Sequence, residues 1–192
     1  MQSHFFAYIN RLNLINRWQL MATNRNESVA AHTMMTATIA HCLATVTNTL
    51  YGGNVDVGRV TQCALFHDAT EVLTGDMPTP IKYANPALLA AYKGVEKEAT
   101  DRMIAMLPTE LRPAYLACLD FDDDPDVYPY VKAADTLSAY IKCIEEVNLG
   151  NRDFSVALES TKTKLDAIDL PAVRYFVETF LPSLSLPLDS LR

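Results

Sequence analysis

A chain of 192 residues with 49% apolar side chains is long enough and apolar enough to bury the core of one ordinary domain. Its formal net charge of −7 argues against polymeric nucleic acid as a partner, because neutralising a phosphate backbone requires a basic face. The charge does not exclude a small anionic substrate held by a few local cations.

The cysteines and the N-terminal segment indicate the compartment. The four cysteines form no CxxC pair and lie in apolar helical contexts, as buried thiols in a reducing compartment do. They are Cys42, Cys63, Cys118 and Cys143. Asparagine and arginine interrupt the apolar residues near the N-terminus, so no signal-peptide core is present. No run approaches the ~18 apolar residues of a membrane span. We expect a soluble cytoplasmic protein with no membrane partner.

Helical spacing of apolar residues dominates the first half of the chain. It predicts helices over 5–12, 28–50 and 56–73, and Gly52 is the expected stop after the second of these. Residues 74–80 combine glycine, proline and polar residues, which is typical of a loop.

The second half of the chain continues the same pattern. Asn85 before Pro86 is a favourable helix start, and Gly150 closes a long helix. The predicted helices cover 85–107, 108–119, 128–149, 154–168 and 171–181. No strand alternation, internal repeat or low-complexity linker is visible. The sequence therefore predicts an all-α, bundle-like single domain over 1–192.

The four histidines differ in their surroundings. His4 is near the chain end, and His41 follows His32 by nine residues, which places the two on opposite sides of one helix. His32 and His67 have apolar helical neighbours, and each taken alone is explained as a core histidine with a satisfied ring.

The residues after His67 favour a different explanation. Asp68 is adjacent, and Glu71 lies about one turn further along the predicted helix. Burying carboxylates beside an imidazole is costly unless a divalent cation, which accepts both nitrogen and oxygen ligands, lies among them. Asp135, mid-helix with small neighbours, is the best candidate for a ligand from a distant helix. Taken alone, Asp135 is also explained as an exposed helix residue.

Five motifs carry a resemblance to a known family: NLINRWQLM, ESVAAHT, ALFHDATEVLTGDMPTPIKY, VKAADTLSAYIKCIEE and FLPSL. The H…HD…D arrangement is similar to that of the HD-domain metal-dependent phosphohydrolases. The five motifs, in this order and spacing, resemble the bacterial 5′-deoxynucleotidases of the YfbR-like group. The resemblance covers nearly the whole chain.

The resemblance implies an HD-domain fold and hydrolysis of 2′-deoxyribonucleoside 5′-monophosphates to deoxynucleoside and phosphate, with tolerance across bases. It implies one divalent metal ion. Mixed nitrogen and oxygen ligands do not select one metal, so Co²⁺, Mn²⁺ and Zn²⁺ all fit. It also suggests a homodimer, with aromatic residues such as Tyr140 or Phe176 at the interface. The implied metal ligands are His32, His67, Asp68 and Asp135.

Catalytic and substrate-binding roles also come from the resemblance. Glu71 is expected to move protons, and Arg17 to bind phosphate oxygens. Asp76 is expected to hold the water, protonate the leaving group or hydrogen-bond the 3′-hydroxyl of the sugar, and the sequence does not separate these roles. The expected substrate contacts are Arg17, Trp18, His32, Asp68, Asp76, Met77, Pro78 and Thr79. Trp18 is either a flat wall against the sugar, where it would exclude a 2′-hydroxyl, or core filler. Lys82 is either a further positive charge near the site or a solvated loop residue.

One departure from the family pattern concerns the residues flanking His32. Where the family often has Glu and Ser, this chain has Ala31 and Thr33. If the missing Glu orients the imidazole or caps the helix, one support of the site is weakened. Two alternative functions stay open. One is another HD-type phosphohydrolase that acts on a cyclic nucleotide or a nucleoside triphosphate. The other is a nucleotide-binding module without catalysis, and Ala31 is the only residue that supports it.

Overall fold

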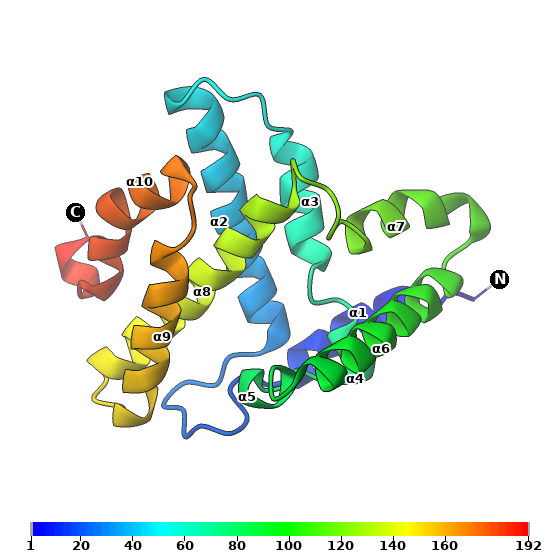
Figure 1. Cartoon of the computed structure of the whole chain (residues 1–192), viewed down its shortest axis with the longest axis horizontal. Coiled ribbons are helices and arrows are strands. Elements are labelled where there is room, and N and C mark those ends of the chain that lie inside the picture. The colour runs from blue at the N-terminus through cyan, green and yellow to red at the C-terminus, as the bar shows by residue number, and fades with distance from the viewer. Residues whose placement is uncertain (1, 192) are drawn as a thin grey trace.

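The computed structural model describes residues 2–191, which form an all-α molecule (Figure 1). Short 3₁₀ turns occur between and after the α-helices, and within the described residues the only β-type pairing is an isolated bridge between Asn16 and Ser28. The predicted fold class is confirmed. The α-helices are α1 (Phe5–Arg11), α2 (Val29–Leu50), α3 (Val57–Phe66), α4 (Glu71–Thr74), α5 (Thr79–Lys82), α6 (Pro86–Ala105), α7 (Arg112–Leu119), α8 (Tyr128–Asn148), α9 (Ser155–Asp166) and α10 (Pro171–Thr179).

Side-chain caps explain where several helices begin. The hydroxyl of Ser28 accepts the backbone N–H of Ala31 at the start of α2. Asp56 caps α3 in the same way, and Asn85 caps α6 with a proline in the first turn. Each cap satisfies a backbone N–H that has no partner inside the helix. These starts agree with the sequence prediction within one residue.

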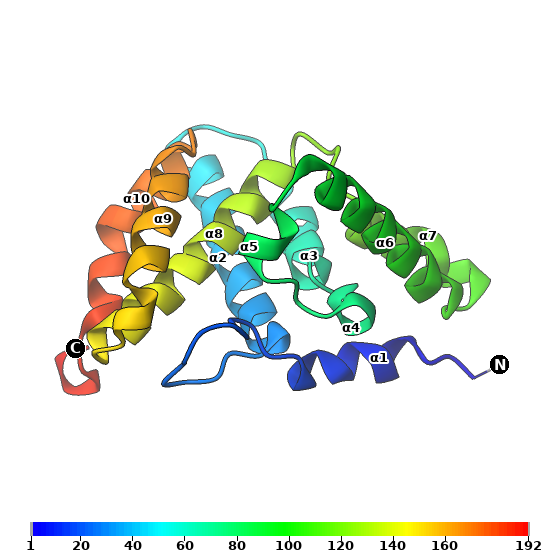
Figure 2. The same ribbon diagram turned by 60° about the horizontal axis from the view of Figure 1, so that its bottom comes forward.

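The core is centred on α2, which lies between α3 and α8 (Figures 1 and 2). Leu43, Val60 and Leu137 from these three helices are completely buried in the main apolar cluster. A second cluster, which includes Phe5 and Ala69, joins α1 to α6 and α7. Because Ala69 directly follows Asp68, the His67–Asp68 doublet is held between the two clusters.

Helix α2 is long and apolar enough to cross a membrane by length and composition, which the sequence reading of short apolar runs did not anticipate. In the most apolar part of α2, 56% of the residues are buried inside the protein. The position of α2 at the centre of the bundle accounts for this apolar character (Figure 2).

The predicted single helix over 56–73 is wrong. Helix α3 ends at Phe66, and four turn residues precede the short helix α4. The backbone N–H groups of Ala69 and Glu71 donate to carbonyls only three residues earlier. His67 Nδ1 lies 2.8 Å from the carbonyl oxygen of Ala64, the acceptor that the N–H of Asp68 would use in a continuous helix. The histidine side chain thus replaces a helical hydrogen bond at the break.

Two further predictions need correction. Residues 74–80 are not entirely a loop, because α5 begins at Thr79. Gly75 ends α4 with a φ of +74°, a left-handed conformation that glycine adopts without strain. Phe176 is buried in the core, where its ring lies 5.3 Å from that of Phe180, so Phe176 does not provide an exposed dimer surface.

Candidate metal centre

Three side chains from three helical elements meet at one point. His32 comes from the first turns of α2, His67 from the end of α3, and Asp135 from α8. The two Nε2 atoms are 3.3 Å apart, and Asp135 Oδ1 lies 3.2 Å from His32 Nε2. Their donor atoms all lie within 4.8 Å of one another, which is the spacing of ligands around one ion. Asp135 is therefore not the exposed helix residue of the alternative reading.

The outer nitrogen of each ring has its own partner. His67 Nδ1 faces the carbonyl of Ala64, which can only accept, so this nitrogen carries a proton and Nε2 is the atom directed at the other side chains of the group. His32 Nδ1 lies 3.1 Å from Ser138 Oγ, and its Nε2 lies 3.4 Å from the hydroxyl of Thr36. The two Nε2 atoms face each other across 3.3 Å. This arrangement fits a cation between the rings.

Asp68 joins this group and connects it to Arg17. Its Oδ2 atom lies 3.1 Å from His67 Nε2 and 3.6 Å from His32 Nε2. Arg17 Nη1 donates to the same oxygen at 3.2 Å. The structure thus brings together all four side chains expected to bind metal, although Asp68 shares its oxygen with a guanidinium.

The charges of the group perturb one another strongly. Burial acts to lower the pKa of His67, but the adjacent Asp68 outweighs burial and raises it. Burial acts to raise the pKa of Asp68, and the contacts with His67, His32 and Arg17 instead hold it below the usual range. The pKa of Asp135 is also lowered against the effect of burial, first by Lys132 and then by His32. The carboxylates are thereby kept in the anionic form that binds a metal.

Glu71 differs from these carboxylates because it lacks a partner. Its Oε2 atom is buried without a hydrogen bond. Burial, reinforced by the negative charges of Asp68 and Asp76, raises the pKa of Glu71 to about 10. Burial also raises the pKa of Asp76, although Arg17 opposes it. A protonated carboxyl beside an anionic cluster can donate a proton to a bound group.

Arg17 and Trp18 lie on the irregular segment before α2. Glu27 Oε2 lies 3.3 Å from Arg17 Nε and accepts the indole N–H of Trp18 at 2.9 Å. The Trp18 ring is half-buried, with its centroid 5.1 Å from that of Phe154. Trp18 therefore packs on the protein while part of its surface is accessible. Both readings of Trp18 retain a basis in the structure.

The remaining predicted substrate residues follow Asp76 in the connection between α4 and α5. Met77 and Pro78 are half-buried, and Thr79 is exposed at the start of α5. Lys82 is not a free solvated lysine, because it donates to Glu96 at 2.8 Å and lies over the ring of Tyr92.

Sequence reasoning did not identify Ser138 and Glu27, which hold the predicted site residues in place. Ser138 follows Asp135 by three residues on α8, so the helical period could have placed it near His32. Glu27 precedes α2 in a segment without regular structure, where no periodic pattern applies.

Ala31 is at the third position of α2 and is exposed to solvent. A Glu at this position would complete a capping box with Ser28 rather than touch the imidazole. His32 is oriented by Ser138 instead. The departure at Ala31 therefore affects the helix start and leaves the donor set intact.

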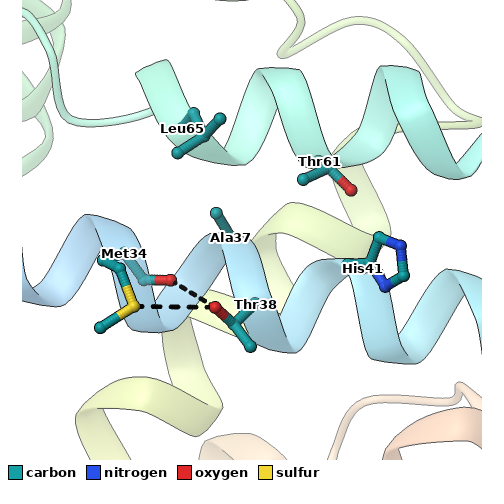
Figure 3. A pocket seen from close by; sticks show the side chains of 6 residues that line it. All are labelled: Met34, Ala37, Thr38, His41, Thr61 and Leu65. Carbon is teal, nitrogen blue, oxygen red and sulfur yellow. Dashed lines mark hydrogen bonds between the residues drawn. The ribbon is translucent and has the colours of Figure 1, made fainter.

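His41 is not part of this group of side chains, as its spacing from His32 predicts. His41 is exposed, while His32 is completely buried. Figure 3 shows His41 on α2 beside α3, where Thr61 and Leu65 of α3 complete a hollow of about 370 Å³ between the two helices.

Comparisons with known proteins agree with this geometry. A family model described as "5'-deoxynucleotidase YfbR-like" matches residues 4–184. A curated 5′-deoxynucleotidase YfbR of Escherichia coli (strain ATCC 8739) is 44% identical over 193 residues, which is 99% of this chain and 96% of that protein. An HD-domain phosphohydrolase from Listeria innocua superposes with a TM-score of 0.83 at 25% identity, covering 94% of this chain and 88% of that one. A cyanophage S-2L HD phosphohydrolase, solved with dA and one catalytic Zn²⁺ ion, shares the fold with a TM-score of 0.62 at 20% identity, covering 93% and 95%.

Proposed function

The chain belongs to the YfbR-like family of 5′-deoxynucleotidases, and we propose that it hydrolyses 2′-deoxyribonucleoside 5′-monophosphates to deoxynucleoside and phosphate in a metal-dependent reaction. The observation that supports this most directly is the convergence of His32, His67 and Asp135 on one point, with two imidazole nitrogens and a carboxylate oxygen facing inward. A buried cluster of this composition is stable with a divalent cation at its centre.

The proposed ligands of the ion are His32, His67, Asp68 and Asp135. Two imidazoles and two carboxylates suit several divalent ions, including Zn²⁺, Mn²⁺ and Co²⁺. When bound, the ion would supply Lewis-acid activation of water and offset charge on the phosphoryl group. The cyanophage protein of the same fold holds one catalytic Zn²⁺ ion, and in this chain the identity of the metal is left open.

Arg17 is proposed to bind the phosphate. Two of its nitrogens already face Glu27 and Asp68, which fixes the plane of the guanidinium. The remaining N–H donors form a fixed positive fork for phosphate oxygens. Loss of this fork would raise KM more than it lowers kcat, since the contact exists before and during the reaction.

Glu71 is proposed to transfer the proton to the leaving 5′-oxygen. Its burial, and a buried oxygen without a hydrogen-bond partner, favour the protonated carboxyl, which is the form able to donate. Asp76, on the connection after Gly75, is proposed to assist this transfer or to hold the sugar. Met77, Pro78 and Thr79 would line the substrate on the same connection.

Trp18 is proposed to select the sugar. A half-buried indole beside the phosphate-binding arginine would leave deoxyribose unhindered and crowd a 2′-hydroxyl. Trp18→Ala should therefore narrow the ratio of kcat/KM for dAMP over AMP. An unchanged ratio would assign the indole to packing alone.

The experiment that tests the activity is phosphate release after metal stripping and reconstitution with single ions. Matched substrates are dAMP, AMP, 3′-dAMP, a cyclic nucleotide and a nucleoside triphosphate. We expect metal-dependent release from dAMP, with dAMP preferred over the ribose and 3′ analogues. Turnover of the cyclic nucleotide or the triphosphate with inert monophosphates would support the other HD-type phosphohydrolase instead. Tight binding of dAMP without any release over hours would support a silent binding module.

The proposed setting is the cytoplasm, with the whole chain acting as one HD-domain unit and associating as a homodimer. All four cysteines carry free thiols, which persist in reducing compartments. Exposed apolar side chains such as Met34 and Leu65 offer surface for association. Tyr140 offers less surface, because it is half-buried and packs against the core. Light scattering across a concentration series would measure the mass of the assembly, and a monomer at micromolar concentration would rule the dimer out.

A further inference from the structure

Trp18 has an unusual backbone. Its φ of +60° makes it the only non-glycine residue with a positive φ within residues 2–191. A bulky side chain in the left-handed region is strained, and such strain persists only where surrounding contacts enforce it. The contacts that enforce it should therefore be part of how the site is built.

Glu27 is the residue that contacts both Trp18 and Arg17, while the backbone N–H of Met21 donates to the carbonyl of Trp18 at 2.9 Å. The carboxylate oxygen Oε2 of Glu27 accepts the indole N–H of Trp18 at 2.9 Å and lies 3.3 Å from Nε of Arg17. Its backbone carbonyl accepts the backbone N–H of Arg17 at 2.9 Å. One residue thus holds the main chain and both functional side chains of the Arg17–Trp18 pair.

The other contacts of the pair leave its orientation to Glu27. Phe154 supports one face of the indole, but a ring contact at 5.1 Å between centroids does not fix rotation in the plane. Asp68 binds Nη1 of Arg17 and is itself engaged with the two histidines. Only the carboxylate of Glu27 reaches both side chains.

We propose that Glu27 is a positioning residue that sets the Arg17 guanidinium and the Trp18 indole relative to each other, and thereby sets the preference for a deoxyribose 5′-phosphate. Glu27 does not contact the substrate in this account. It acts because one carboxylate oxygen ties the phosphate-binding group to the sugar-selecting group at a fixed distance. The inference deepens the proposed function and rests on it.

The chain offers a spectroscopic test, because Trp18 is its single tryptophan. Fluorescence and acrylamide quenching therefore report on this indole alone. We compare wild type with Glu27→Ala, with Glu27→Gln, and with Glu98→Ala as a matched control at an exposed position on α6. Thermal melting and metal content are measured in parallel.

Glu27→Ala should shift the emission to longer wavelength and increase quenching, because the indole loses its hydrogen-bond acceptor. It should also lower kcat/KM for dAMP by about tenfold to a hundredfold and narrow the dAMP over AMP ratio, while metal content stays at the wild-type level. Glu27→Gln keeps an oxygen acceptor for the indole but loses the charge opposite Arg17. It should retain the emission and the sugar preference, and raise KM for dAMP about tenfold.

Several outcomes would overturn the inference. Wild-type emission and sugar preference in Glu27→Ala would show that Glu27 does not position Trp18. A wild-type KM in Glu27→Gln would show that its charge does not hold Arg17, and this holds even if Glu27→Ala fails to fold. If Glu98→Ala changes the Trp18 emission and kcat/KM as much as Glu27→Ala does, the changes come from the loss of a negative charge anywhere on the protein and not from the position of Glu27. If wild-type protein releases no phosphate from dAMP, the proposed function fails, whereas the fluorescence comparison still measures whether Glu27 holds the indole.

Discussion

Two buried charged clusters share one face of α8 and differ in whether they are complete. Asp135, Ser138, Lys142 and Glu146 fall on one stripe of this helix by the helical period. The N-terminal part of the stripe, with Asp135, belongs to the candidate metal centre and is called the upper cluster. The C-terminal part, with Lys142 and Glu146, holds the segment around residues 24–25 against α8 and is called the lower cluster.

The lower cluster contains its own cation and satisfies every acceptor. Lys142 donates to Glu146 at 2.5 Å, and both side chains are almost completely buried. The same carboxylate accepts the backbone N–H groups of Asn24 and Arg25 and the amide of Asn151. Burial acts to raise the pKa of Glu146, but these donors outweigh it and hold the pKa at about 2.

The upper cluster has an excess of acceptors. Its histidines direct their Nε2 atoms at each other across 3.3 Å, and Glu71 has a buried oxygen without a hydrogen bond. The pKa of Glu71 rises to about 10, the opposite direction from Glu146. The lower cluster is complete in itself and stabilises the fold. In the upper cluster Arg17 and Lys132 pair with the carboxylates, but two imidazoles and a carboxylate oxygen still converge on one point, which suits a bound cation.

The largest effect is expected from removing a ligand of the upper cluster. Asp135→Ala should abolish both metal binding and metal-dependent turnover, because the side chain faces His32 at 3.2 Å. Lys142→Met in the lower cluster should leave the metal content unchanged. Elemental analysis of dialysed protein measures both. Full metal occupancy in Asp135→Ala would remove Asp135 from the ligand set.

Glu71→Gln should separate chemistry from binding. The amide keeps the shape of the side chain but cannot donate a carboxyl proton, so kcat should fall by about 10²–10⁴-fold while metal and substrate still bind. Single-turnover kinetics with dAMP, beside a metal titration, measure the two effects. If metal binding is lost to the same degree as turnover, Glu71 is a ligand and not the proton donor.

In the lower cluster, Glu146→Ala should reduce the free energy of unfolding by about 3–5 kcal/mol, because it leaves Lys142 buried without a partner. The folded pKa of Glu146, about 2, lies below the ordinary value of 4.5. A depressed pKa gives stability that is present above pH 4.5 and is lost as the pH falls towards 2.

Denaturant unfolding of wild type and Glu146→Gln across this pH range should therefore show a difference in the free energy of unfolding that becomes smaller as the pH falls. Lys142→Met combined with Glu146→Leu should recover much of the loss, since no unpaired charge is left. If the difference in the free energy of unfolding between the two proteins does not change with pH, the charge of Glu146 does not stabilise the fold.

The smallest effect is expected at Ser138, which supports the metal centre from one step away. Ser138→Ala removes the contact that orients the His32 ring at 3.1 Å, and it should weaken metal affinity by roughly 10–100-fold without removing the site. Competition with a chelator of known affinity measures the change. Affinity at the wild-type level would mean that packing of the buried ring alone holds His32.

The sequence predicted the helices because apolar spacing and capping residues such as Ser28 and Asn85 act locally. The HD doublet stands out among apolar residues, and the family resemblance implied the other members of the candidate metal centre. The break after Phe66 was missed, since it depends on the ring of His67 reaching the carbonyl of Ala64. Glu27 and the Lys142–Glu146 pair were missed for the same reason: their partners are tertiary contacts that no local pattern records.

X-ray absorption at the metal edge of the reconstituted protein tests the central claim most directly. The account predicts one ion per chain, coordinated by two imidazole nitrogens and by oxygen atoms, with one imidazole lost in His67→Ala. Coordination by sulfur, or an imidazole contribution that is unchanged in both His32→Ala and His67→Ala, would contradict it.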